Sequence, residues 1–205
     1  MAEPLAFLDV DTQADFMLPD GKLYVPGAEQ IIPNLERLFT WAREHDIPVI
    51  SSADAHSPDD PSFSEWPPHC VVGTTGQRRI RETQLPSATV VPNRPGSFVA
   101  PVKWSGQWVV EKQEYDVSTN VNFAAILVAL GPRRFVVFGV ATDYCVLSSV
   151  LALRRRGVPV DLVVDAIKPI TEEGGQNAID QMVIAGARLV KTSEVCGVEE
   201  NMPGH

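Results

Sequence analysis

A thiol, a carboxylate and an amine each follow an apolar run in this chain. Cys145 comes after the run 135–138 and the turn 139–141, in the first turn of a predicted helix. A helix N-terminus favours a thiolate and can hold an oxyanion with its free N–H groups. Asp11 could take the thiol proton, and Lys112 could keep Asp11 charged. The pattern favours Cys145 as a nucleophile, with simple packing as the alternative.

A second group has the residue types of a metal site. Asp54 and His56 form a D-x-H pair, and His69 follows in the same Pro-rich segment. Carboxylate and imidazole ligands suit zinc, the divalent ion we expect first, with iron or manganese as alternatives. Glu65 is the expected fourth protein ligand. Ser62, a water molecule or Cys70 could take that place instead, and a structural role for the loop is the competing interpretation.

These side chains need a scaffold, and the hydrophobic pattern predicts alternating strands and helices. Apolar runs predict strands over 5–10, 48–52, 88–91, 107–110, 135–138, 158–164 and 187–190. Helical spacing predicts helices over 28–44, 77–84, 122–130, 145–156 and 173–185. Repeated βα units imply a three-layer α/β/α fold with a mostly parallel, doubly wound sheet. Without a break in composition, we expect one domain over residues 1–205.

The predicted sheet brings the chemical groups together. Ligands of open α/β sheets bind at the carboxyl ends of the strands, which share one edge. Asp11, Asp54, Lys112 and Cys145 all lie at or just beyond such ends. Their convergence at one edge favours a catalytic site over four unrelated polar positions.

Composition restricts the partners. The chain has 17 Lys and Arg against 26 Asp and Glu, a formal net charge of −9. This charge argues against nucleic acid or an anionic membrane as a partner.

Three widely spaced cysteines favour a reducing compartment, the cytoplasm, and we find no signal peptide or membrane span. The oligomeric state stays open, a homo-oligomer included. Trp104 and Trp108 could form a lid or a subunit contact, or simply pack, and the tail after Cys196 is expected to fray.

Several segments together resemble the isochorismatase-like cysteine hydrolases, and among them the nicotinamidases. The likeness spans residues 5 to about 165. The segments are D-T-Q-A-D-F from Asp11, D-A-H from Asp54, W-P-P-H-C-V-V-G-T from Trp66, Lys112, and G-V-A-T-D-Y-C-V from Gly139.

The resemblance implies a catalytic triad of Asp11, Lys112 and Cys145. It also implies a cis peptide between Val140 and Ala141, and an oxyanion hole made by the N–H groups of Ala141 and Cys145. In nicotinamidases a metal ion coordinates the pyridine nitrogen. The metal ligands would be Asp54, His56 and His69, with Glu65 where some members place a carboxylate. Substrate contacts would come from Phe16, Trp66, Val140 and Ala141.

The implied reaction is hydrolysis of nicotinamide to nicotinate and ammonia through a thioester. The segment after Lys112, Q-E-Y-D-V-S-T-N, departs from the family pattern in a region that shapes the pocket. Another small amide or a ureido compound is therefore the main alternative substrate. A non-catalytic, metal-bearing binding module is the remaining alternative, because fold alone does not fix function.

Overall fold

The computed structural model describes residues 4–104, 106–131 and 133–197. Within these residues, seven strands form one sheet in the order β3-β4-β2-β1-β5-β6-β7, and every neighbouring pair is parallel. The strands are β1 (Leu5–Val10), β2 (Val49–Asp54), β3 (Thr89–Val91), β4 (Gln107–Lys112), β5 (Arg134–Val140), β6 (Val160–Lys168) and β7 (Arg188–Val190). The predicted sheet is confirmed, and its described pairings are parallel throughout.

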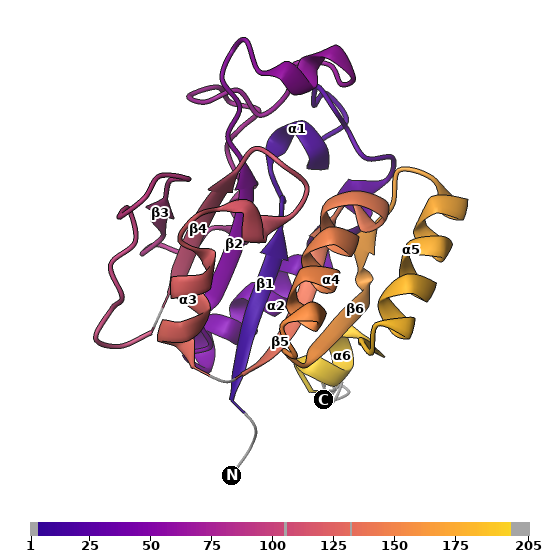
Figure 1. The fold of residues 1–205 in the computed structure, drawn as a ribbon. Coiled ribbons are helices and arrows are strands. Elements are labelled where there is room, and N and C mark those ends of the chain that lie inside the picture. The colour runs from indigo at the N-terminus through magenta and orange to yellow at the C-terminus, as the bar shows by residue number, and fades with distance from the viewer. Residues whose placement is uncertain (1–3, 105, 132, 198–205) are drawn as a thin grey trace, which may run out of the picture.

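Helices cover both faces of the sheet (Figure 1). The α-helices are α1 (Ala14–Met17), α2 (Ile32–Glu44), α3 (Phe123–Leu130), α4 (Leu147–Arg155), α5 (Glu172–Ile184) and α6 (Thr192–Val195). Shorter helical turns are η1 (Ala28–Ile31), η2 (Pro61–Ser64), η3 (Arg81–Thr83), η4 (Val117–Thr119) and η5 (Thr142–Val146). One core cluster joins α3, α4 and α5 to the sheet, and the other joins α2 and η1 to the opposite face. The three predicted layers are therefore confirmed.

The amphipathic pattern explains why these helices lie where they do. In α2, Leu35, Leu38, Phe39 and Ala42 are buried at helical spacing, while Pro33 stands in the first turn, where its missing N–H costs nothing. In β5, six consecutive side chains are buried, as expected for a strand covered on both faces.

Some predicted boundaries were wrong. Strands β2 and β4 continue two residues further than predicted, to Asp54 and Lys112, which are partners in the parallel register. The helix predicted over 77–84 is only the single 3-10 turn Arg81–Thr83. This segment crosses over the sheet edge and bonds to the residues after β1, so tertiary contacts replace a regular helix.

The close approach of β1 and β5 requires a glycine. Gly139 has a φ of +116°, and a Cβ atom there would lie 2.1 Å from the carbonyl oxygen of Val10. Only a residue without a side chain fits this contact. It brings the ends of β1 and β5, and so Asp11 and the segment before Cys145, to the same place on the sheet edge.

Candidate active site

Lys112 joins the groups at the carboxyl edge. Its side chain is completely buried, and its Nζ lies 2.8 Å from Oδ2 of Asp11 and 2.5 Å from Oδ1 of Asp54. The same Nζ lies 3.6 Å from the sulfur of Cys145. The structure thus brings together the acid, the amine and the thiol that the sequence singled out, and it adds Asp54 as a second carboxylate on the amine.

Burial and charge set the ionisation of this group. Burial raises the pKa of the Cys145 thiol well above its usual value, and Lys112 only partly opposes it. Burial also raises the pKa of Asp11, against the lowering effects of Lys112 and Ser52. Burial would lower the pKa of Lys112, but Asp11 and Asp54 outweigh it and raise it well above the usual value. Burial therefore favours the neutral form of the Cys145 thiol, and the two aspartates favour the ammonium form of Lys112.

The backbone before Cys145 is unusual. The peptide bond between Val140 and Ala141 is cis, as the resemblance implied. Residues 142–146 then form one π-helical turn, in which the N–H of Val146 donates to the carbonyl oxygen of Ala141 at 3.1 Å. The prediction that Cys145 lies in the first turn of an α-helix was therefore wrong in detail, because α4 begins only at Leu147. Such π turns often occur at functional sites.

Asp54, His56 and His69 form a buried cluster with the composition of a metal site. One ligand atom from each residue lies within 4.8 Å of the others. The Nε2 atoms of both histidines face Oδ2 of Asp54 at 3.6 Å. Oδ1 of Asp54 contacts the ammonium of Lys112, whereas Oδ2 faces the two histidines. This carboxylate therefore links the amine to the metal-type cluster.

The other ring nitrogen of each histidine is already engaged. Nδ1 of His56 lies 3.0 Å from Oδ2 of Asp60, and Nδ1 of His69 lies 2.8 Å from the carbonyl oxygen of Pro67. Metal-binding histidines usually have such outer partners, which orient the ring and fix the tautomer. Both Nε2 lone pairs are thus directed to the same point as the Asp54 oxygen, an arrangement that fits a divalent cation.

The expected fourth ligands lie outside this cluster. Glu65 and Ser62 line the same cavity, but neither belongs to the group of three. The hydroxyl of Ser62 donates to Asp60 at 2.6 Å. Cys70 is buried, its sulfur lies 3.9 Å from the carbonyl oxygen of Gly76, and it is likewise outside the group.

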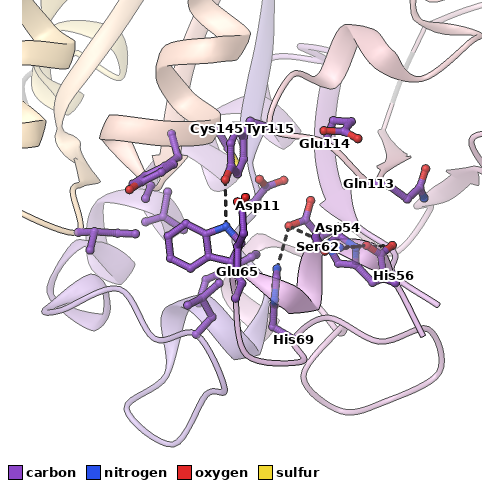
Figure 2. A pocket seen from close by; sticks show the side chains of 18 of the residues that line it. Asp11, Asp54, His56, Ser62, Glu65, His69, Gln113, Glu114, Tyr115 and Cys145 are labelled. Carbon is purple, nitrogen blue, oxygen red and sulfur yellow. Dashed lines mark hydrogen bonds and ion pairs between the residues drawn. The ribbon is translucent and has the colours of Figure 1, made fainter. Parts of the chain in front are cut away.

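A cavity of about 520 Å³ opens in front of the thiol (Figure 2). Asp11, Cys145 and the three metal-type residues line it, as do the four predicted substrate contacts, Phe16, Trp66, Val140 and Ala141. Its volume lies within the usual range for small-molecule sites, ~300–1,000 Å³.

Aromatic rings form part of the cavity wall. The indole N–H of Trp66 donates to the hydroxyl of Tyr115 at 2.9 Å, and both rings pack edge-on against Tyr144. Phe16 is 7% exposed, belongs to the core on the α2 side, and its ring also contacts that of His69. Phe16 therefore combines the core role and the cavity role that the sequence left as alternatives.

Sequence reasoning missed three supporting residues. Ser52 donates from its hydroxyl to Oδ1 of Asp11 at 2.6 Å, and Asp60 contacts His56. The side-chain amide of Gln13 donates to the carbonyl oxygen of Asp54 and accepts from its N–H, at 2.8 and 2.7 Å. Gln13 lies inside the D-T-Q-A-D-F segment. A polar side chain in such a buried stretch was the one signal in the sequence that could have indicated its role. Ser52 gave none, since it acts on a residue 41 positions away, and Asp60, four residues after His56, belongs to no recognisable motif.

Trp104 and Trp108 pack against Phe98 and one core cluster, and neither lines the cavity. The packing interpretation of these residues is therefore the one that fits, and a lid over this cavity does not. Cys70 and Cys145 are both free thiols. Apart from Gly197, the tail after Cys196 lies outside the described residues. No helix within the described part of the chain combines the length and apolar character that a membrane span needs.

Known proteins have similar sequences and folds along nearly the whole chain. A nicotinamidase from Acinetobacter baylyi is 27% identical, over 95% of each chain. A nicotinamidase/pyrazinamidase from Mycobacterium tuberculosis is 27% identical over 92% of this chain and 99% of its own. The crystal structure of a pyrazinamidase from Pyrococcus horikoshii in complex with zinc superimposes with a TM-score of 0.78 and 29% identity, covering 91% of this chain and 98% of that one. The isochorismatase domain matches residues 6–194, and the chain therefore belongs to the isochorismatase family.

Proposed function

We propose that this protein is a metal-dependent cysteine amidohydrolase that converts nicotinamide to nicotinate and ammonia through a thioester. The observation that carries the proposal is the position of Lys112. Its ammonium contacts the carboxylate beside the thiol and the carboxylate of the metal-type cluster. The nucleophile and the cluster thus share one cavity, and the similar nicotinamidases support the choice of substrate.

Acylation would begin with proton transfer from Cys145 to Asp11 as the sulfur attacks the carboxamide carbon. Because the thiol is neutral at rest, its deprotonation must accompany the attack. Lys112 would stabilise the negative charge that develops on sulfur, and the N–H groups of Ala141 and Cys145 would hold the oxyanion. Asp11 would then deliver its proton to the nitrogen as the carbon–nitrogen bond breaks. Ammonia leaves, and the acyl group stays on sulfur.

Deacylation would repeat these steps with water. Asp11, again a carboxylate, would take a proton from the attacking water molecule, while the same N–H groups hold the second oxyanion. The carbon–sulfur bond breaks, the sulfur regains its proton from Asp11, and the acid product leaves and gives its proton to ammonia or solvent, which yields nicotinate. One water is consumed for each ammonia and carboxylate formed, so no oxidant or further co-substrate is needed.

A divalent ion, with zinc first and iron or manganese as alternatives, would be held by Asp54, His56 and His69. When bound, it supplies a Lewis acid for the pyridine nitrogen and so orients the ring. Glu65 is retained as the proposed fourth protein ligand, with water or Ser62 as alternatives. Phe16 and Trp66 would hold the ring between them, and Val140 and Ala141 would contact the carboxamide.

The test is ammonia release from nicotinamide by the purified chain loaded with zinc, iron or manganese. Cys145→Ala should abolish release, whereas Cys196→Ala, a thiol away from the cavity, should retain it. Rapid quenching followed by mass spectrometry should find a nicotinoyl adduct on the peptide that contains Cys145. Chelation should remove activity, and added metal should restore it.

The other outcomes point elsewhere. Ammonia from aliphatic amides or ureido compounds, without any from nicotinamide, would replace the proposed substrate and keep the mechanism. Activity that survives complete metal removal would exclude a role for the ion in orienting the substrate. A chain that binds metal but releases no ammonia from any amide would be the non-catalytic module.

A further inference from the structure

The charged side chains that line the cavity are mostly carboxylates. Five carboxylates face it, namely those of Asp11, Asp54, Asp60, Glu65 and Glu114. Among the described residues, no Lys or Arg lines it. The nearest ammonium, that of Lys112, lies behind the wall, fully buried between Asp11 and Asp54. Apart from the two histidines of the metal-type cluster, an anion in this cavity would therefore meet negative groups and no Lys or Arg side chain among the described residues.

The five carboxylates fall into an inner and an outer set. Asp11 and Asp54 share Lys112, and Asp60 contacts His56 and Ser62. Glu65 and Glu114 are exposed, and within the described part of the chain neither side chain has a hydrogen bond or an ion pair. Figure 2 shows both among the side chains around the cavity. A cation at the inner cluster would offset the inner charge, and Glu114 would still lack a counter-charge.

We propose that Glu65 and Glu114 select substrates by charge. Amides with a neutral or cationic group in the outer part of the cavity are accepted, and amides with a carboxylate there are rejected. This inference rests on the proposed function, since it names the class of amide that the same site takes. A cavity of about 520 Å³ leaves room for such a group beyond a pyridine ring. Ureido compounds that carry a carboxylate belong to the rejected class.

The same charges act on the product. Hydrolysis turns a neutral carboxamide into a carboxylate at the inner end of the cavity, where it adds a negative charge to those of the lining carboxylates. The outer glutamates would therefore weaken product binding and favour release, because like charges repel even across a solvated cavity. We expect nicotinate to inhibit weakly compared with neutral ring analogues.

The test uses two derivatives of nicotinamide that differ in charge. One carries an aminomethyl group and the other a carboxylate, both at the ring carbon meta to the carboxamide. At low ionic strength, wild-type kcat/KM should favour the cationic derivative. The double variant Glu65→Gln and Glu114→Gln should reduce this preference about fivefold, and salt should reduce it in the wild type as well. The double variant should also bind nicotinate more tightly.

The control is Glu44→Gln, which removes an exposed carboxylate from the C-terminal end of α2, before β2 begins and away from the cavity. It should leave the preference unchanged. Glu114→Gln alone should give part of the effect, and zinc content measured for each variant will separate charge selection from loss of a metal ligand at Glu65.

A binding measurement keeps this inference separate from the proposed function. Zinc-loaded Cys145→Ala is titrated with both derivatives and with nicotinate, and calorimetry measures the binding. This measurement requires no turnover. If wild type does not hydrolyse nicotinamide, the proposed function fails. If Cys145→Ala binds the cationic and anionic derivatives equally, or the double variant keeps the wild-type preference, charge selection by these glutamates is wrong.

Discussion

Substitution of Ser52 by alanine should move the acid limb of the pH profile to higher pH. The Ser52 hydroxyl donates a buried 2.6 Å hydrogen bond to Oδ1 of Asp11. A hydrogen bond to a charged group is worth ~1.5–3 kcal/mol, which corresponds to about one to two pH units in the pKa of the acceptor. Asp11 must be a carboxylate to accept a proton, so activity is lost below its pKa. Burial already raises this pKa, Lys112 and Ser52 lower it, and removing the Ser52 hydroxyl raises it further.

The assay is kcat/KM for nicotinamide measured across the acid range, with thermal denaturation to check folding. Ser51→Ala is the matched control, because Ser51 is the preceding residue, equally buried, and donates to Asp9 instead, at 2.8 Å. The acid limb of Ser51→Ala should stay at the wild-type position. Ser52→Thr retains a hydroxyl, so its acid limb should lie close to that of the wild type. A uniform loss of kcat/KM in Ser52→Ala, with the acid limb unmoved, would refute the reasoning.

Three further predictions follow from other contacts. Tyr115→Phe removes the oxygen that accepts the Trp66 indole N–H. The lost hydrogen bond, worth ~1 kcal/mol, should raise KM for aromatic amides about fivefold and leave kcat unchanged. An equal rise in KM for an aliphatic amide would contradict this prediction. Asp60→Asn should weaken zinc binding ~10- to 100-fold in competition with a chromophoric chelator, because Nδ1 of His56 loses its charged partner; unchanged affinity would argue against that role. Gly139→Ala should lower the free energy of unfolding, measured in urea, by about 3 kcal/mol, because a side chain there meets the backbone of β1. An unchanged free energy of unfolding would show that β1 and β5 can move apart at little energetic cost.

The sheet and the residues at its edge could be predicted from the sequence for a definite reason. Parallel strands covered on both faces appear as unbroken apolar runs, such as the one before Gly139, and parallel topology places all their carboxyl ends together. Asp11, Lys112 and Cys145 could thus be assigned to one edge without knowledge of the strand order. The boundaries of β2 and β4 were less accessible, because Asp54 and Lys112 are polar and stay in the strands only through mutual pairing.

The supporting contacts could not be derived in the same way. Ser52 reaches Asp11 because β1 and β2 are neighbours, and no local pattern encodes which strands lie side by side. In the sequence, Asp60 cannot be told from an ordinary loop residue, and only the structure shows that its carboxylate contacts His56. The π turn before α4 depends on the bonds from the N–H groups of Val146 and Leu147 to the carbonyl oxygens of Ala141 and Thr142, and the apolar spacing beyond it is the same as in an α-helix.

The divided carboxylate of Asp54 has an evolutionary consequence. Oδ1 contacts the ammonium of Lys112 and Oδ2 faces the two imidazoles of the proposed metal site, so the histidines and the aspartate are not equally dispensable. A descendant that abandoned its metal could replace both imidazoles freely. Position 54 would have to remain acidic as long as position 112 is lysine, because a neutral residue there would leave a wholly buried ammonium with one anion in place of two.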